Sequence, residues 1–379
     1  MTQIPHNKPS FGKEEIKALE RVVKSGCLIM GEEVDKLQES FKKYLNVRYA
    51  LATNSGISAV HLSLIALGVG KNDEVILPTY TFSGLLNTIY YQGAIPILVD
   101  IEKKGFTIDP TQVKKKINKR TKVIIVPHTF GIPAEINVIK KLGIPVIEDC
   151  AHALGSFYND KPLGSFGDIS IFSFYATKMI ATGQGGIFTT NNKKYFDCAY
   201  DLIRYDQRKD YKIRYNYQQT DLAACLGNVQ FKKLGSFIDR RRANVLRYIN
   251  VLEKYNQFTY WPKRADTNLN NYRFIIQFDN QKVRDELQNH FSQKGVSTIV
   301  PIDNYQLLHN LLKMSKRDFP NAETLTKTTL SLPIYPSLTT EDNIKIATIL
   351  DSLCKKYLTK NLSFDPVISR KKVLVENVI

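Results

Sequence analysis

The feature that most constrains the fold is an alternation of short apolar runs with helical segments between residues 49 and 190. Runs such as Val75-Ile-Leu77 and Lys122-Val-Ile-Ile-Val126 are too short for helices and carry few polar side chains. Strands of this kind are typical of a parallel sheet whose two faces are both covered by helices. The pattern therefore predicts an α/β domain.

The texture of the sequence changes after residue 190, where one long helical run is predicted over residues 218–256, followed by mixed strands and helices. At 379 residues the chain exceeds a typical single core. We predict a large domain over residues 1–240 and a smaller α+β domain over residues 241–379. The N-terminal segment could pack on the small domain, and we expect the tail after residue 360 to be loosely held.

Composition narrows the class of protein. The net charge of +17, from 53 basic and 36 acidic residues, favours anionic partners. No zinc finger, RNA-binding motif or basic heptad region accompanies the charge, so we predict a solvated surface and no nucleic-acid partner. We expect no membrane segment, because no run of 18 apolar residues and no signal-peptide core is present. Five scattered cysteines without metal spacing indicate reduced thiols and a cytoplasmic protein.

One lysine stands out in the stretch from Ile171 to Gly186, which begins as an apolar run and ends in a glycine cluster. Lys178 has no acidic residue within five positions on either side. A lysine near apolar backbone and without a carboxylate partner tends to lose its charge, and the neutral amine attacks carbonyl groups. A surface lysine in a glycine turn explains the pattern equally well.

Two other features precede this lysine. The Ser55-Gly56 turn opens a predicted helix, whose free N–H groups would suit a phosphate, although such turns are more often simple helix caps. Asp149 ends an apolar strand at the sheet edge where ligands usually bind, or it caps the segment that follows. His152 could be a core histidine, and with no second histidine at a ligand spacing we predict no metal site.

Together, a phosphate turn, a strand-end carboxylate and an unpaired lysine are the parts that pyridoxal phosphate (PLP) requires. The lysine forms the Schiff base, and the carboxylate keeps the ring nitrogen protonated so that the ring accepts electrons. The helix N-terminus would hold the phosphate. We therefore predict PLP as the cofactor.

A series of short motifs supports this prediction: Asn54-Ser-Gly56, Pro78-Thr-Tyr-Thr-Phe82, Glu148-Asp-Cys-Ala-His152, Ser173-Phe-Tyr-Ala-Thr-Lys178, Gly183-Gln-Gly-Gly186, Tyr215-Asn-Tyr217 with Ala223-Ala224 and Gly227, and Leu332-Pro-Ile-Tyr-Pro336. In this order they resemble the DegT/StrS-type sugar aminotransferases, PLP enzymes of fold type I. The resemblance runs from about Pro9 to Leu353. It implies a mainly parallel, seven-stranded sheet in the large domain.

The resemblance also implies roles around the cofactor ring. Lys178 would be the Schiff-base lysine and proton shuttle, and Asp149 would pair with the pyridine nitrogen. His152, where many relatives have glutamine, would lie beside the ring oxygen. Phe82 falls at the position whose aromatic ring stacks on the pyridine face.

A second group of residues is implied at the phosphate. The backbone of Gly56 and Ile57 and the hydroxyl of Ser173 would hold it. Asn216 matches a residue that reaches the phosphate from the neighbouring subunit, which implies a homodimer with shared sites.

The substrate is less constrained by these motifs. Ile57 replaces the usual threonine, Gln218-Gln219 stands where relatives often have Arg-Met, and Val300–Tyr305 lacks the family's His-Tyr-x-Pro-Leu-His pattern. We predict an aminotransferase of aminosugar biosynthesis that acts on a nucleotide-linked keto-deoxysugar, with glutamate as amino donor. One alternative is a PLP-dependent sugar dehydratase, although by resemblance those enzymes carry histidine in place of Lys178. The other is a non-catalytic, PLP-binding regulatory protein.

Overall fold

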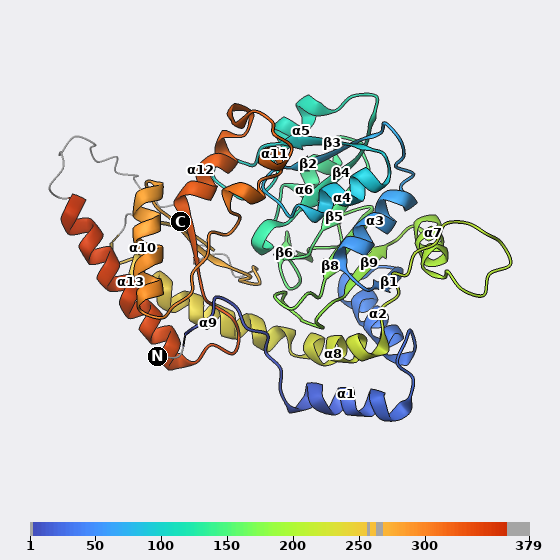
Figure 1. Ribbon diagram of the computed structural model, residues 1–379, viewed down its shortest axis with the longest axis horizontal. Coiled ribbons are helices and arrows are strands. Elements are labelled where there is room, and N and C mark those ends of the chain that lie inside the picture. The colour runs from blue at the N-terminus through green and yellow to red at the C-terminus, as the bar shows by residue number, and fades with distance from the viewer. Residues whose placement is uncertain (1–2, 256–257, 263–267, 362–379) are drawn as a thin grey trace, which may run out of the picture.

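The computed structural model describes residues 3–255, 258–262 and 268–361 (Figure 1). Its centre is a seven-stranded sheet with strand order β1-β9-β8-β5-β4-β2-β3. The strands are β1 (Tyr49–Thr53), β2 (Glu74–Pro78), β3 (Ile95–Val99), β4 (Thr121–Pro127), β5 (Val146–Asp149), β8 (Ile169–Ser173) and β9 (Gly186–Thr190). Strand β9 is antiparallel to both neighbours, and the pairs from β8 to β3 are parallel. The predicted α/β fold with a mainly parallel, seven-stranded sheet is confirmed.

Both faces of this sheet are buried. In β2, Val75 and Leu77 belong to the hydrophobic cluster on one face, whereas Ile76 belongs to the cluster on the other. Strand β4 alternates in the same way. Because neither face meets water, these strands read as continuous apolar runs rather than as alternating ones.

Helices supply the two covers of the sheet. The cluster that includes Val75 and Leu77 is covered by helices that include α2 (Glu32–Leu45), α3 (Gly56–Ala66), α4 (Gly84–Tyr91), α7 (Lys193–Ile203) and α8 (Asp221–Lys232). Two others, α5 (Pro110–Lys116) and α6 (Ile136–Lys140), contribute to the opposite cluster. Helix α1 (Lys13–Ser25) packs on α8 at the lower edge of the molecule (Figure 1).

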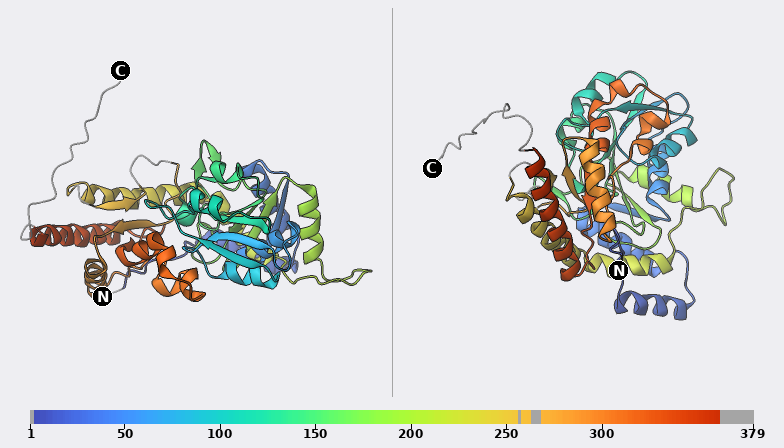
Figure 2. Two further views of the ribbon diagram at one scale, coloured as in Figure 1. Left: turned by 90° about the horizontal axis from the view of Figure 1, so that it is seen from above. Right: turned by 60° about the vertical axis from the view of Figure 1, so that its left-hand side comes forward.

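The C-terminal part has its own antiparallel sheet and hydrophobic cluster. Its elements are β10 (Thr259–Trp261), β11 (Phe274–Gln277), β12 (Thr329–Leu332), α9 (Leu234–Leu252), α10 (Gln281–Gln293) and α13 (Thr340–Asn361). Helices α9 and α13 lie side by side (Figures 1 and 2). The N-terminal segment joins this part, because Ile4 donates to Gly295 O (2.8 Å) and accepts from Ser297 N (2.9 Å).

The predicted helical run over residues 218–256 is wrong in one respect. Helices α8 and α9 are separate and meet at Lys233, whose backbone (φ −87°, ψ −5°) departs from α-helical geometry. Residue 240 lies inside α9, and the division of the chain at that point stays a prediction. Of the tail predicted to be loose after residue 360, residues 362–379 lie outside the described residues.

The chain returns from the C-terminal part to the large sheet through α11 (Leu308–Leu311) and α12 (Pro320–Thr328). Leu308 and Leu325 join the hydrophobic cluster of the large sheet. The carboxylate of Asp100, just after β3, accepts from Asn321 N (2.8 Å) and Ala322 N (3.0 Å) and so caps α12. The C-terminal part is therefore attached to the large sheet both by this segment and by α9.

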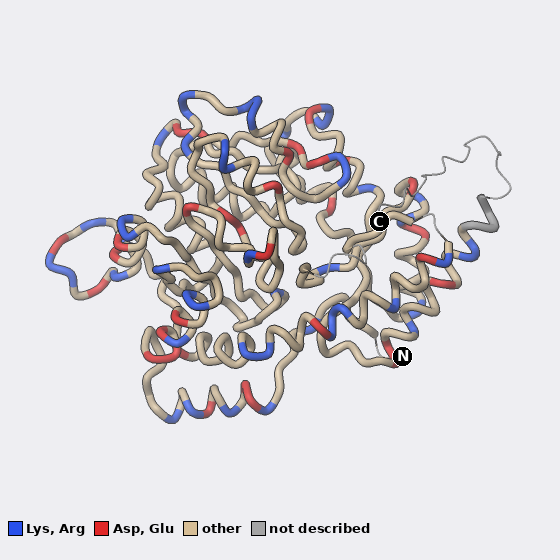
Figure 3. The backbone as a smooth tube through the Cα atoms, turned by 180° about the vertical axis from the view of Figure 1, so that it is seen from behind, with Lys and Arg blue, Asp and Glu red and all other residues tan. Residues whose placement is uncertain are grey.

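The surface bears two further features. Lysine and arginine are spread over helices and loops rather than gathered in one patch on the face shown in Figure 3. The segment between α7 and α8 projects from the body of the molecule (Figure 2). In the described parts of the chain, no helix has the length and apolar character needed to cross a bilayer.

Candidate active site

The predicted site residues gather at the edge of the sheet where the parallel strands end. Gly186, the first residue of β9, is paired with Thr53 at the end of β1 and with Ser173 at the end of β8. Asp149 ends the next strand, β5. This is the edge at which open α/β sheets bind ligands.

The phosphate turn at this edge is tightly packed. Ser55 caps α3 by accepting a hydrogen bond from Ser58 N (3.0 Å). A β-carbon on Gly56 would lie 2.9 Å from Cβ and 3.3 Å from Oγ of Ser173. Across the described chain, the N–H groups of Gly56 and Ile57 have no hydrogen-bond partner. The turn thus offers two free N–H groups at a helix N-terminus beside a serine hydroxyl, which are the donors that a phosphate needs.

The side chain of Phe82 lies beside this turn. Its side chain is 64% exposed, which is unusual for a phenylalanine that follows a buried strand. A β-carbon on Gly84 would lie 2.4 Å from Cε1 of Phe82 and 3.0 Å from Cδ1 of Ile57. The two side chains therefore converge at Gly84, and the aromatic ring stays accessible to a planar ligand.

Asp149 is 8% exposed, and its Oδ1 accepts a hydrogen bond from Ala151 N (2.9 Å). The capping interpretation thus accounts for one carboxylate oxygen, whereas Oδ2 has no partner in the described chain. Burial raises the pKa of Asp149, and the Ala151 N–H and the positive charge of Lys178 lower it in part. Asp149 and Lys178 are therefore close enough to interact electrostatically.

Lys178 is half-buried, and its Nζ lies 5.8 Å from the ring centroid of Tyr272. Among the described residues, no carboxylate lies within ion-pair distance of it. The amine is thus not engaged by an acidic side chain.

His152 lies against the same aromatic ring. It stacks on Tyr272 with a centroid distance of 4.3 Å and, more loosely, on Phe130 at 5.8 Å. Burial, with the charges of Lys178 and Arg273, holds the pKa of His152 well below its usual value, so the ring is neutral. Its Nδ1 accepts from Phe130 N (3.4 Å), which leaves the proton on Nε2 as a free donor.

A row of aromatic rings extends from His152 to Trp261. Phe130 contacts Phe106 at 5.3 Å between centroids, and Phe106 contacts Trp261 at 4.8 Å.

Tyr272 was missed by the sequence analysis. It stands at the start of an apolar run that indicates only a strand, and its place beside Lys178 arises from the tertiary fold.

Asn216 is exposed, and its carbonyl oxygen accepts from Asn54 Nδ2 (2.9 Å) of the same chain. The neighbouring Tyr217 O accepts from Asn54 N (2.9 Å). The backbone of this loop therefore lies beside the phosphate turn. No described residue forms a hydrogen bond with the side-chain amide of Asn216, and its role in a partner's site stays a prediction.

Behind Asp149, the potential ligand atoms of His128, Glu148 and Cys150 lie within 4.8 Å of one another. Glu148 is already saturated, because it accepts from His128 Nε2 (3.0 Å), Ser170 Oγ (3.0 Å) and three backbone N–H groups. Burial alone would raise the pKa of Glu148, but these hydrogen bonds outweigh it and lower the pKa. The arrangement fits a buried network that fixes the end of β5.

His309 is a second residue that the sequence analysis missed. Its Nδ1 lies 2.7 Å from Thr79 Oγ1, and its Nε2 lies 3.2 Å from Glu323 Oε1. It thus joins the end of β2 to α11. The signal was present in the sequence, because Asn304–His309 keeps the tyrosine, leucine and second histidine of the His-Tyr-x-Pro-Leu-His pattern.

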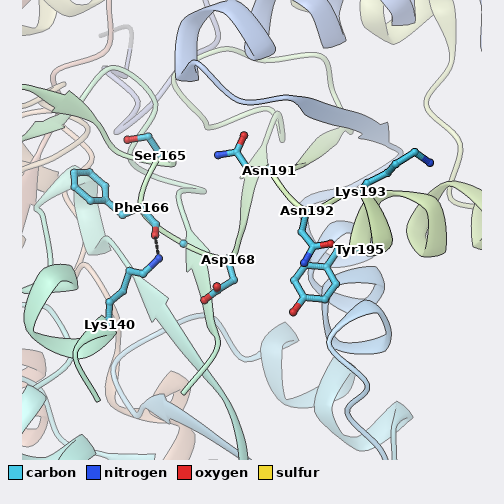
Figure 4. A pocket seen from close by; sticks show the side chains of 9 residues that line it. Lys140, Ser165, Phe166, Asp168, Asn191, Asn192, Lys193 and Tyr195 are labelled. Carbon is cyan, nitrogen blue, oxygen red and sulfur yellow. Dashed lines mark hydrogen bonds between the residues drawn. The ribbon is translucent and has the colours of Figure 1, made fainter. Parts of the chain in front are cut away.

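Two cavities have volumes of about 590 Å³ each. The one in Figure 4 lies at the start of β8 and the end of β9, the sheet edge opposite Asp149. Its polar groups are engaged within the fold: Asp168 accepts from Val146 N (2.9 Å) and Asn192 caps α7. The second cavity is bordered by Arg273 and by residues 298–306.

Comparisons with known proteins identify the family of the chain. A model of the DegT/DnrJ/EryC1/StrS aminotransferase family matches residues 9–351. GDP-perosamine synthase of Escherichia coli O157:H7 is 34% identical over 367 residues, which cover 91% of this chain and 97% of that protein. The spore coat polysaccharide biosynthesis protein SpsC of Bacillus subtilis (strain 168) is 31% identical, with 89% and 94% covered. The Spr1654 protein of Streptococcus pneumoniae, solved in its PMP form, has a TM-score of 0.87 at 25% identity, with 95% and 100% covered.

Proposed function

The chain belongs to the DegT/DnrJ/EryC1/StrS aminotransferase family, and we propose that it converts a nucleotide-linked keto-deoxysugar to an aminosugar with glutamate as amino donor. It is a transaminase with PLP as cofactor. The names of two relatives, a GDP-perosamine synthase and a spore coat polysaccharide biosynthesis protein, support a sugar nucleotide as acceptor. One observation carries the proposal: Lys178, which has no carboxylate partner among the described residues, lies near Asp149 at the same sheet edge as the Ser55-Gly56 turn with its two free N–H groups.

The residues at this edge fit PLP. The free N–H groups of Gly56 and Ile57 and the hydroxyl of Ser173 would hold its phosphate. The exposed ring of Phe82 would cover the pyridine face. Asp149 would hold a proton at the ring nitrogen, and Nε2–H of His152 would donate to the ring oxygen.

When bound, PLP supplies an electron sink that makes the α-proton of the amino donor acidic. Lys178 Nζ acts as general base and takes this proton. Asp149 would keep the ring nitrogen protonated, and its burial would strengthen this contact because the surrounding dielectric is low. Over the whole reaction the amino group of glutamate is exchanged for the oxygen of the sugar ketone, so the products would be 2-oxoglutarate and the aminosugar.

Two further properties belong to this proposal. We propose a homodimer in which Asn216 reaches the partner's phosphate, supported by its exposure and by its place beside Asn54 at the phosphate turn. We also propose a cytoplasmic location, which the five free cysteines support.

The test is a screen of purified enzyme against keto-sugar nucleotides with glutamate, with 2-oxoglutarate formation as the readout. We expect turnover with at least one such nucleotide and none with the free sugar. Turnover with simple keto acids alone would refute the proposed substrate class.

A further inference from the structure

Two arginines next to Lys178 carry charges that no acidic side chain of the described residues balances. Arg241 is 4% exposed and donates one hydrogen bond, from Nη1 to the carbonyl oxygen of Tyr272 (3.2 Å). Its Nε, and the Nε of the half-buried Arg273, are buried without a hydrogen-bond partner. Within the described ranges, neither guanidinium has a carboxylate at ion-pair distance.

Other well-buried arginines are different. The side chain of Arg214 is 4% exposed and pairs with Asp201 and Asp210. The side chain of Arg284 is 6% exposed and pairs with Asp285 (2.6 Å). Since a buried charge is costly unless it is paired, the unpaired arginines indicate a site for an anion.

The position of Arg273 relates this anion site to the reacting lysine. Its guanidinium carbon lies 5.4 Å from the ring centroid of Tyr272, the ring on which His152 stacks and over which Lys178 Nζ lies at 5.8 Å. Although burial raises the pKa of Tyr272, the charges of Lys178 and Arg273 outweigh it and lower that pKa. The region around Tyr272 is therefore strongly positive.

The two arginines differ in how accessible they are to a ligand. Arg273 borders the cavity of about 590 Å³, which is also lined by residues of α10, including the Arg284–Asp285 pair, and by the segment 298–306. Arg241 borders spaces of only about 10 Å³ each, enough for a single water molecule. A ligand can therefore contact Arg273, whereas Arg241 acts from behind through Tyr272 and through its charge.

We propose that Arg273 binds the α-carboxylate of the amino donor, with Arg241 as a positioning residue behind it. The inference rests on the proposed transamination. A planar guanidinium matches a carboxylate in shape and charge. An α-carboxylate is one bond from the carbon whose proton Lys178 takes, so its receptor must lie close to that lysine. The diphosphate of a nucleotide sugar is separated from the ketone by atoms of the sugar ring and suits this place less well.

The test uses Arg273→Gln and Arg273→Lys, with Arg242→Gln as the matched control, because Arg242 lies on the same helix as Arg241 but pairs with Asp239. Isothermal titration calorimetry measures binding of 2-oxoglutarate and, separately, of inorganic phosphate to each protein. We expect Arg273→Gln to raise the Kd for 2-oxoglutarate by roughly 10- to 100-fold, the size of a lost charge-assisted contact. Arg273→Lys should show a smaller rise and Arg242→Gln none.

Steady-state kinetics with both substrates give a second readout. The KM for glutamate should rise in Arg273→Gln, while the KM for the nucleotide sugar stays unchanged. An unchanged Kd for 2-oxoglutarate, or a loss confined to the nucleotide sugar or to phosphate, would overturn the assignment. If the wild-type protein aminates no sugar, the proposed function fails, but the calorimetry still decides the role of Arg273. Arg241→Gln should weaken 2-oxoglutarate binding less than Arg273→Gln does, and an equal or larger loss in a variant that melts like wild type would reverse the two roles.

Discussion

Gly186 and Gly56 meet so closely that a β-carbon on Gly186 would lie 2.5 Å from the backbone nitrogen of Gly56. The first residue of β9 is thus pressed against the turn that we propose holds the phosphate. Gly186→Ala must displace this turn, because backbone atoms cannot yield as a flexible side chain can. We expect PLP affinity to fall at least ~10-fold, the effect of losing one or two phosphate hydrogen bonds, as measured by equilibrium dialysis.

Gly235→Ala is the control for this substitution. A β-carbon there meets nothing within 4 Å, and the residue lies in α9, where alanine is favoured over glycine. We expect unchanged PLP affinity and an equal or slightly higher melting temperature. Equal PLP affinity in wild type and Gly186→Ala would show that the turn does not hold the phosphate.

Lys178→Ala should abolish transamination, because it removes the base that we propose takes the α-proton of the amino donor. Borohydride should trap PLP on the wild-type peptide that contains residue 178, as mass spectrometry can detect. Lys193→Ala removes an exposed lysine paired with Asp197 and should leave turnover unaffected. Appreciable turnover by Lys178→Ala would remove the basis of the assignment.

Asp149→Asn should lower kcat by at least ~10²-fold, the scale of losing a key electrostatic group. The asparagine carbonyl can still accept from Ala151 N, so the cap is kept while the charge is lost. Asp168→Asn is a matched control, because Asp168 also caps backbone but at the opposite sheet edge. If Asp149→Asn keeps a kcat near that of wild type, Asp149 only caps the segment at Ala151 and has no role at the cofactor ring.

The free energy of unfolding should decrease as the pH is lowered, because His61 is protonated more readily in the unfolded chain. Burial lowers its pKa to about 4, whereas in the unfolded chain the pKa is near 6.5. Between these values the unfolded chain binds more protons than the folded one, so acidification favours unfolding. The contribution is complete above pH 6.5 and declines as pH falls toward 4.

The measurement compares urea unfolding of wild type and His61→Gln at pH 7 and pH 5. We expect wild type to lose about 1 kcal/mol more than the variant over this interval, after a discount for partial solvent screening. His61 Nδ1 also forms a hydrogen bond with the hydroxyl of Tyr217 (3.1 Å), in the loop that contains Asn216. Because His61→Gln alters this bond at both pH values, the change in stability between pH 7 and pH 5 is compared, not the stability at pH 7. Parallel pH dependence in the two proteins would exclude His61 as the titrating group.

If Asn216 acts in the partner subunit's site, two variants that are inactive alone should restore activity when they form mixed dimers. Lys178→Ala and a nearly inactive Asn216→Asp protein are mixed, dissociated and allowed to reassociate. Random pairing makes half of the dimers mixed, and each mixed dimer has one intact site, so about a quarter of all sites should regain activity. If Asn216 serves its own chain, every site keeps one defect and mixing restores no activity.

The strands and the cofactor edge could be predicted from the sequence for local physical reasons. A strand buried on both faces is apolar throughout, and Asp149 stands where such a run stops. The helix break at Lys233 was not predicted, because its backbone departs too little from helical geometry to disturb the periodicity. Arg273 and Tyr272 could not be placed by local pattern, since their proximity to Lys178 depends on how β11 meets the large sheet.

The row of rings that ends at Trp261 has an optical consequence. Trp261 is the only tryptophan in the chain, so all tryptophan emission arises from one position. Phe106 and Phe130 connect that position to His152 by ring contacts. A chromophore bound beside His152 lies within range of energy transfer from the indole, and the protein thus carries an intrinsic fluorescent reporter of the occupancy of its own site.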